Sequence, residues 1–295
     1  MNLELRWQEN AWTSCLHAAQ LVAGRRSAVS AELAAAIEPP ALEIVQELHF
    51  AGIPDRLFWR HLLPLSVHEA SKDQLARTAV GKTSGLDAAD SSAAARIGQA
   101  LADLERAYHT AIPNAQEQIA LRRRPLQEAW EARGPGLMHF LKQHVPEDFV
   151  PESAEVILIL PVSSGRGTAH LSYNSVRMEA VLYDPYPQLP EAARLGWLLA
   201  QLNLDLAKYG ERVHRDRLPL VARLAVLPAV LAAAEEVELV RPGTVTLADA
   251  LRIWQVTNAG HEALAEIVQK WWSTQETKQA EWPVALAALD RMLAS

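Results

Sequence analysis

The sequence predicts an α+β protein that is mainly α-helical, with one small sheet packed on a central helix. Two observations support this prediction. Strand-like and helix-like patterns stand side by side only between residues 155 and 208, and apolar residues recur at helical spacing on both sides of that stretch. The expected strands lie near residues 155–161, 168–173 and 176–183, and the central helix covers residues 190–207.

The expected strands follow from short apolar runs and from the turn residues between them. Residues 155–161 form a continuous apolar run rich in β-branched side chains and bounded by prolines, which favours a buried strand. Gly165 and Gly167 then favour a chain reversal. This turn could present backbone N–H groups to an anion, but no helix begins there, so a plain hairpin turn is the favoured interpretation. The alternation of apolar residues changes phase near Asn174, which predicts a bulge or tight turn.

The central helix is expected to start after Pro190, because a proline in the first helical turn sacrifices no hydrogen bond. Leucines recur along it at helical spacing, and the polar residues fall within about a third of its circumference. This polar stripe consists of Glu191, Arg194, Gln201, Asp205 and Lys208. A helix that is otherwise so apolar is expected to lie in the interior.

The rest of the chain reads as helices joined by short loops. Residues 1–85 are expected to form a helical N-terminal region and residues 86–295 an α+β core with C-terminal helices, or the two form one continuous domain. Small and polar residues accumulate without periodicity over residues 78–92, which indicates a mobile loop or a boundary. A long helix is expected to begin at Ser91 or Ser92.

Prolines and capping residues set further expected boundaries. Pro39 and Pro40 are expected to end one helix, and Pro125 is expected to break or kink another. Thr246, followed three residues later by Asp249, predicts the capped start of a helix.

Composition limits the class of protein. The chain has 295 residues, enough for a sizeable core, and 49% of them are apolar and 21% charged, as in soluble globular proteins. The net charge of −7 argues against a general nucleic-acid binder. The N-terminus lacks the pattern of a signal peptide, and no apolar run is expected to approach the roughly 18 residues of a membrane span. A cytoplasmic protein without nucleic-acid or membrane partners is therefore expected.

No complete catalytic or metal-binding motif is present. Lys82 and Thr83 resemble the end of a phosphate-binding loop, but Ala76 occupies the position of its first glycine. The His-Glu pairs at His68 and His261 lack the second histidine of the H-E-x-x-H zinc motif. The single cysteine excludes an intramolecular disulfide and a zinc site built from thiolates. No metal and no cofactor is therefore expected.

The order of elements from Val156 to Leu206 resembles the core of zincin-type metallopeptidases: an apolar strand, a Gly-x-Gly turn, an irregular second strand and then a helix. In that family an edge strand lines the substrate cleft, and the following helix carries the zinc ligands. The helix here reads EAARLGWLLAQ from Glu191 to Gln201 and contains no histidine. The resemblance thus implies a scaffold without the metal, onto which none of the family's catalytic residues can be carried over.

Three functional hypotheses follow. The first is a non-catalytic protein that binds a peptide, a protein partner or a small ligand in a cleft between the second strand and the polar stripe of the central helix. The competing interpretation is that the stripe faces solvent or pairs internally. The candidate binding residues are Arg194, Gln201, Asp205, Tyr173 and Arg166.

The other two hypotheses use residues elsewhere in the chain. A hydrolase could assemble its site from dispersed side chains, for which the candidates are His170, Glu179, His214 and His261. A structural oligomer could form through C-terminal tryptophans, for which core packing is the competing explanation. Those tryptophans are Trp254, Trp271, Trp272 and Trp282.

Overall fold

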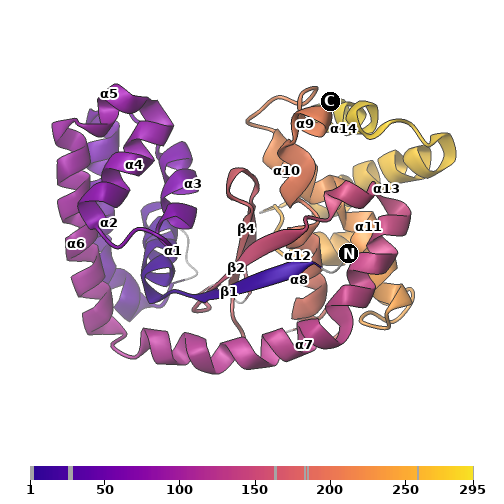
Figure 1. Ribbon diagram of the computed structural model, residues 1–295, viewed down its shortest axis with the longest axis horizontal. Helices are drawn as coiled ribbons and strands as arrows, with labels where there is room; N and C mark the ends of the chain where they lie inside the picture. The colour runs from indigo at the N-terminus through magenta and orange to yellow at the C-terminus, as the bar shows by residue number, and fades with distance from the viewer. Residues whose placement is uncertain are drawn as a thin grey trace. The chain divides into compact units, whose positions relative to one another are not determined.

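A computed structural model describes residues 3–25, 29–162, 165–182, 184, 186–257 and 259–294 (Figure 1). The chain is 66% helical and contains one small four-stranded mixed sheet. The α+β, mainly helical fold class predicted from the sequence is therefore confirmed. The turn residues Ser163 and Ser164 lie outside the described residues.

The chain folds into two compact units. The first unit comprises Met1–Trp7, Arg124–Val156 and Gly165–Ser295. The second unit comprises Gln8–Arg123 and Ile157–Ser164. The boundary expected at residue 85 falls inside the second unit, between two of its helices.

The second unit is built from helices. They are α1 (Ala11–Ala23), α2 (Ala31–Phe50), α3 (Asp55–Leu65), α4 (Lys72–Ser84), α5 (Leu86–Ala89) and α6 (Ser92–Ala111). α2 and α4 both contact α6, and α1 contacts α2. The expected helix end at Pro39 and Pro40 is wrong, because α2 continues through both prolines and buries Ile37, Ala41 and Ile44 on one face. Burial of that apolar face outweighs the local cost of the prolines.

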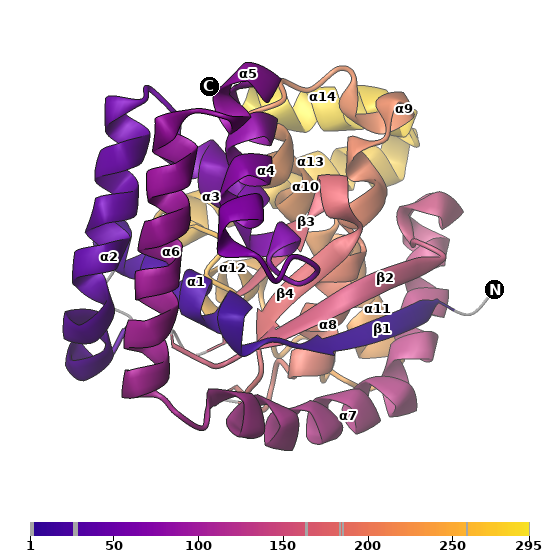
Figure 2. The same cartoon turned by 60° about the vertical axis from the view of Figure 1, so that its left-hand side comes forward.

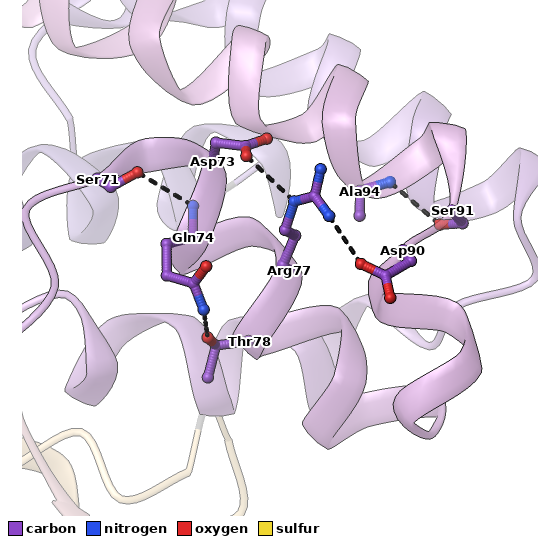
Figure 3. A network of polar contacts seen from close by, with 8 residues as sticks. All are labelled: Ser71, Asp73, Gln74, Arg77, Thr78, Asp90, Ser91 and Ala94. Atoms are coloured by element: carbon purple, nitrogen blue, oxygen red, sulfur yellow. Dashed lines mark hydrogen bonds and ion pairs between the residues drawn. The ribbon is translucent and has the colours of Figure 1, made fainter.

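Most of residues 78–92, expected to be a mobile loop or a boundary, is helical. α4 and α5 occupy this stretch, and the small residues that suggested a loop let the helices approach closely. Figure 3 shows how polar contacts fix the segment: Arg77 Nε donates to Asp73 Oδ2 at 3.1 Å, and Arg77 Nη1 donates to Asp90 Oδ1 at 2.7 Å. The expected cap of the following helix is confirmed, because the Ser91 side chain caps α6.

The apparent phosphate-binding motif also lies in this region. Lys82 and Thr83 are part of α4, where the Thr83 hydroxyl donates to the Ala79 carbonyl oxygen at 2.7 Å. A regular helix does not provide the curved backbone that cradles a phosphate.

The sheet has the strand order β1-β2-β4-β3. Its strands are β1 (Glu4–Glu9), β2 (Ser153–Ile159), β3 (Gly167–His170) and β4 (Ser175–Glu179). Figure 2 shows β1, β2 and β4 side by side. β1 was not expected from the sequence, which suggested helices and loops for the N-terminal residues. β3 and β4 are antiparallel, with Gly167 opposite Met178 and His170 opposite Ser175.

The predicted phase change near Asn174 is confirmed. The strand predicted over residues 168–173 is β3, which ends at His170. The residues after it form a short 3-10 turn, η2 (Leu171–Tyr173). Asn174 then has a left-handed backbone with φ of 46°, and its side chain Nδ2 donates to the Ser153 carbonyl oxygen at 2.8 Å. The strand predicted over residues 176–183 is β4, which ends at Glu179.

Helices form the rest of the first unit. They are α8 (Glu191–Leu199), η3 (Leu202–Asp205), α9 (Ala207–Gly210), α10 (Leu218–Ala225), α11 (Leu227–Glu236), α12 (Leu247–Ile253), α13 (His261–Lys278) and α14 (Trp282–Met292). A short 3-10 turn, η1 (Glu147–Phe149), precedes β2. The long helix α7 (Ala115–His144) continues through Pro125, so the expected break there is wrong. The expected capping box of Thr246 and Asp249 is confirmed at the start of α12.

The central helix is α8, which contacts β3 and β4. All nine of its residues are buried, which confirms the predicted interior position. It ends at Leu199 instead of residue 207 because the chain tightens into η3, where Asn203 Nδ2 donates to the Asp148 carbonyl oxygen at 2.7 Å.

One apolar stretch is longer than the sequence analysis expected. Leu218–Glu236, with a mean hydropathy of 1.7, is long and apolar enough to cross a membrane. This stretch comprises α10 and α11, and 72% of it is buried inside the fold, as in the core helix of a soluble protein. Its length and composition alone are therefore weak support for a membrane span.

Candidate functional site

Five charged residues from the β3–β4 hairpin and α8 lie together in the first unit. This charge cluster consists of Arg166, Arg177, Glu179, Glu191 and Arg194. Four of them are buried: Arg177 is 5% exposed, Glu179 0%, Glu191 8% and Arg194 1%. Charged side chains are seldom buried to this extent unless they are paired or functional.

The pairing of the two strands brings the hairpin residues together. Glu179 N donates to the Arg166 carbonyl oxygen at 2.8 Å, and Thr168 lies opposite Arg177. Alternate residues of a strand point to the same side of a sheet. One face of the hairpin therefore carries Arg166, Thr168, Arg177 and Glu179. The other face carries apolar residues such as Met178.

The Gly165–Gly167 turn does bind an anion, and that anion is the Glu179 side chain. Glu179 Oε2 accepts hydrogen bonds from Gly165 N at 2.7 Å and from Arg166 N at 3.1 Å. Gly165 has φ of 99°, a conformation that suits glycine. The hairpin predicted at this turn is wrong, because β3 pairs with β4 and not with β2. The turn is held instead by a buried carboxylate from β4.

The start of α8 is joined to the same turn. Arg194 forms an ion pair with Glu191, and Arg194 Nη2 also donates to the Glu179 carbonyl oxygen at 3.1 Å. A Cβ atom at Gly165 would lie 3.0 Å from Arg194 Nη1, so the glycine gives the guanidinium room. Asp184 Oδ1 accepts from Glu191 N at 3.0 Å, which satisfies one N–H at the helix start.

Burial perturbs two of these groups in opposite senses. It raises the pKa of Glu191 to about 7, helped by the negative charges of Asp184 and Glu179 and opposed by Arg194. Burial also lowers the pKa of Arg177 to about 10. Glu191 is therefore partly protonated near neutral pH, whereas Arg177 remains charged.

Several guanidinium donors of the cluster lack acceptors. Within the described part of the chain, Arg177 Nη1, Arg194 Nε and Arg194 Nη1 are buried without a hydrogen-bond partner. A buried donor left unsatisfied costs about 1–3 kcal/mol, and more when the group is charged. These donors are the part of the cluster that could bind another molecule.

The predicted binding residues are divided between two places. Arg166 and Arg194 belong to the charge cluster, while Gln201 is 1% exposed and donates from Nε2 to the Trp197 carbonyl oxygen at 2.8 Å. Tyr173 and Asp205 lie at the other end of the hairpin, where Asp205 Oδ2 accepts from the hydroxyl of the neighbouring Ser172 at 3.5 Å. The expected single polar stripe is wrong, because the helix ends before Gln201 and its polar residues are buried.

Arg177 is the member of the cluster that sequence reasoning missed. The alternation of apolar and charged residues could have identified it. Residues 176, 178 and 180 are apolar, so Arg177 and Glu179 lie together on the opposite face of β4. A strand this buried, with two charged residues on one face, indicates a polar site.

The residues proposed for a hydrolase do not gather. His170 lies opposite Ser175, about 13 Å along the strand from Glu179 at the usual rise per residue. His214 is exposed, with Nδ1 3.9 Å from Asp216 Oδ2. Among the described residues, no group of three or more His, Cys, Asp or Glu side chains could hold a metal ion.

Three of the four C-terminal tryptophans are buried in the first unit, and Trp282 is partly buried. Trp254 stacks on Trp197 with ring centroids 5.0 Å apart, and the rings of Trp271, Trp272 and Trp282 contact one another. Trp254, Trp271 and Trp272 are 2%, 3% and 7% exposed, so they offer little surface to a second copy of the chain.

No family model, curated protein or solved structure matches this chain. The fold and the site define the class: a mainly helical α+β protein with a buried cluster of arginines and glutamates on a hairpin and the helix beneath it.

Proposed function

We propose that the protein is a non-catalytic binding protein whose ligand site is the charge cluster. The observation that supports this proposal is the set of three guanidinium nitrogens, on Arg177 and Arg194, that are buried without an acceptor among the described residues. Buried polar groups in proteins are almost always hydrogen-bonded, and exceptions concentrate at functional sites.

A purely structural role accounts less well for the same geometry. A stabilising ion-pair network would match each donor with an acceptor, since burying a charge costs several kcal/mol unless it is fully paired. Here the acceptor atom Glu179 Oε2 is occupied by two backbone N–H groups, and Glu191 carries only part of a charge at neutral pH. A ligand would supply the hydrogen-bond acceptors that Arg177 Nη1, Arg194 Nε and Arg194 Nη1 lack among the described residues.

A binding role agrees with the chemistry of α8. In a metal-free scaffold of the zincin type, this helix would lie beside the ligand without contributing metal ligands, and α8 carries no histidine and a single carboxylate, Glu191. The net charge of −7 favours a peptide or small molecule over nucleic acid as the ligand.

Native mass spectrometry tests this proposal. The full chain is incubated with a cell extract of small metabolites and peptides, desalted and weighed, and we expect a bound ligand mass. The double variant Arg194→Met with Glu191→Gln removes both partners of the ion pair, so neither is left as an unpaired buried charge, and it should lose that mass. The exposed Arg291 provides the matched control Arg291→Met, which should retain it.

Circular dichroism and thermal melting show whether the double variant is folded. A wild-type chain that never retains a ligand would refute the proposal, and so would a folded double variant that retains the ligand as well as the wild type does.

A further inference from the structure

The surroundings of Arg177 favour one chemical class of ligand. The inference drawn from them rests on the proposed function. We infer that the ligand carries an oxyanion, a carboxylate or a phosphate, which the Arg177 guanidinium binds with Arg166 and Arg223 as neighbouring positive charges.

Arg177 has a buried hydrogen-bond donor that lacks an acceptor among the described residues. Arg177 is in the middle of β4 and 5% exposed, and its Nη1 has no hydrogen-bond partner in the described part of the chain. Arg166 is its diagonal neighbour on the paired strand, on the same face and about 7–8 Å away in such a pair. Arg166 Nε is held by Gln255 Oε1 at 2.7 Å, so its position is fixed.

A third arginine comes from outside the hairpin. Arg223 lies in α10, and its carbonyl oxygen accepts a hydrogen bond from Trp197 Nε1 of α8 at 2.8 Å. It is close enough to Arg177 for the two positive charges to repel. Arg166, from the turn before β3, and Arg223, from α10, therefore both lie close enough to act on Arg177.

Two arginines and one glutamate act on the charge of Arg177. Both Arg166 and Arg223 disfavour the charged form of Arg177, and Glu179 is the carboxylate that favours it. Glu179 Oε2 is already engaged by the turn. An added anion would offset the repulsion among the arginines and give Arg177 Nη1 its missing acceptor.

The shape of the donor favours an oxyanion over other ligands. A guanidinium presents N–H groups in a planar fork that matches two oxygens of a carboxylate or a phosphate. The three arginines would repel a cation, and a neutral group would not reduce the repulsion among the arginines.

The inference is tested by titrating the full chain with sodium phosphate and, separately, with sodium acetate, with sodium chloride keeping the ionic strength constant. Isothermal calorimetry should give saturable binding with at least one of the two. Saturation by phosphate alone assigns a phosphate, saturation by acetate alone assigns a carboxylate, and saturation by both assigns the shared oxyanion chemistry. Arg177→Met should weaken binding at least tenfold, as expected for the loss of a charged hydrogen bond, while Arg291→Met should leave it unchanged.

A second measurement covers the case in which Arg177→Met does not fold. The Nε–H resonance of Arg177 in the wild type, assigned with Arg177→Lys, should shift as phosphate or acetate saturates the site. The inference is wrong if neither anion gives saturable heat or a resonance shift in the wild type, or if folded Arg177→Met binds with unchanged affinity. A retained ligand without any oxyanion, identified by its mass, would refute this inference while leaving the proposed function in place.

Discussion

Glu191 should make the stability of the first unit fall as the pH rises from 5 to 8. Its pKa is raised in the folded chain from an ordinary value of 4.5 to about 7, chiefly by burial, so folding favours the protonated form. A raised pKa contributes stability that is fully present below 4.5 and is lost as the pH rises through about 7. The charged groups that act on Glu191 are Arg194, Asp184 and Glu179.

The size of the effect follows from the two pKa values. The difference between 4.5 and about 7 corresponds to about 3 kcal/mol at roughly 1.4 kcal/mol per pKa unit. Gln resembles the protonated acid in shape and charge, so Glu191→Gln should remove this pH dependence. We expect wild type and Glu191→Gln to have similar free energies of unfolding at pH 5. At pH 8 the variant should be more stable by up to about 3 kcal/mol.

Urea unfolding at pH 5 and pH 8 measures the difference. Tryptophan fluorescence is a suitable signal because seven of the nine tryptophans belong to the first unit. Comparing the two proteins at each pH cancels the contributions of all other titrating groups. A difference in free energy that is equal at both pH values would refute the reasoning, as would a wild-type chain that is the more stable of the two at pH 8.

Three further substitutions test local features. Gly196→Ala places a Cβ atom 2.3 Å from Leu137 Cδ2, so it should cost about 1–3 kcal/mol of unfolding free energy, and a second change, Leu137→Ala, should make the cost of the first disappear. Thr246→Ala removes the capping box with Asp249 and should cost about 1 kcal/mol in urea unfolding; no change would mean that the cap does not stabilise α12. Asn174→Ala should be about 1 kcal/mol less stable than Asn174→Gly, because φ is 46° there; equal melting of the two variants would contradict this.

Features decided by neighbouring residues were predicted well. The apolar run at residues 155–161 became β2 with a shift of two residues, and the interior position of α8 and the caps at Ser91 and Thr246 were all expected. Each depends on side-chain periodicity or a capping hydroxyl, which act within a few residues.

Features that depend on distant partners were predicted poorly. Four of the six residues of β1 are polar, and its strand conformation depends on pairing with β2, more than a hundred residues away along the chain. α2 passes through two prolines because its apolar face is buried against α1 and α6. α7 likewise continues through Pro125.

The sequence by itself determined a mainly helical α+β chain with an interior helix after a glycine turn. Tertiary structure alone decided the site: it turned Glu179 onto the Gly165 turn, placed Arg223 near Arg177, and buried these charges together. The physical reason is the distance along the chain over which each kind of interaction acts. Backbone preferences act within a few residues, whereas the burial and pairing of a charge depend on whichever segments the fold brings beside it.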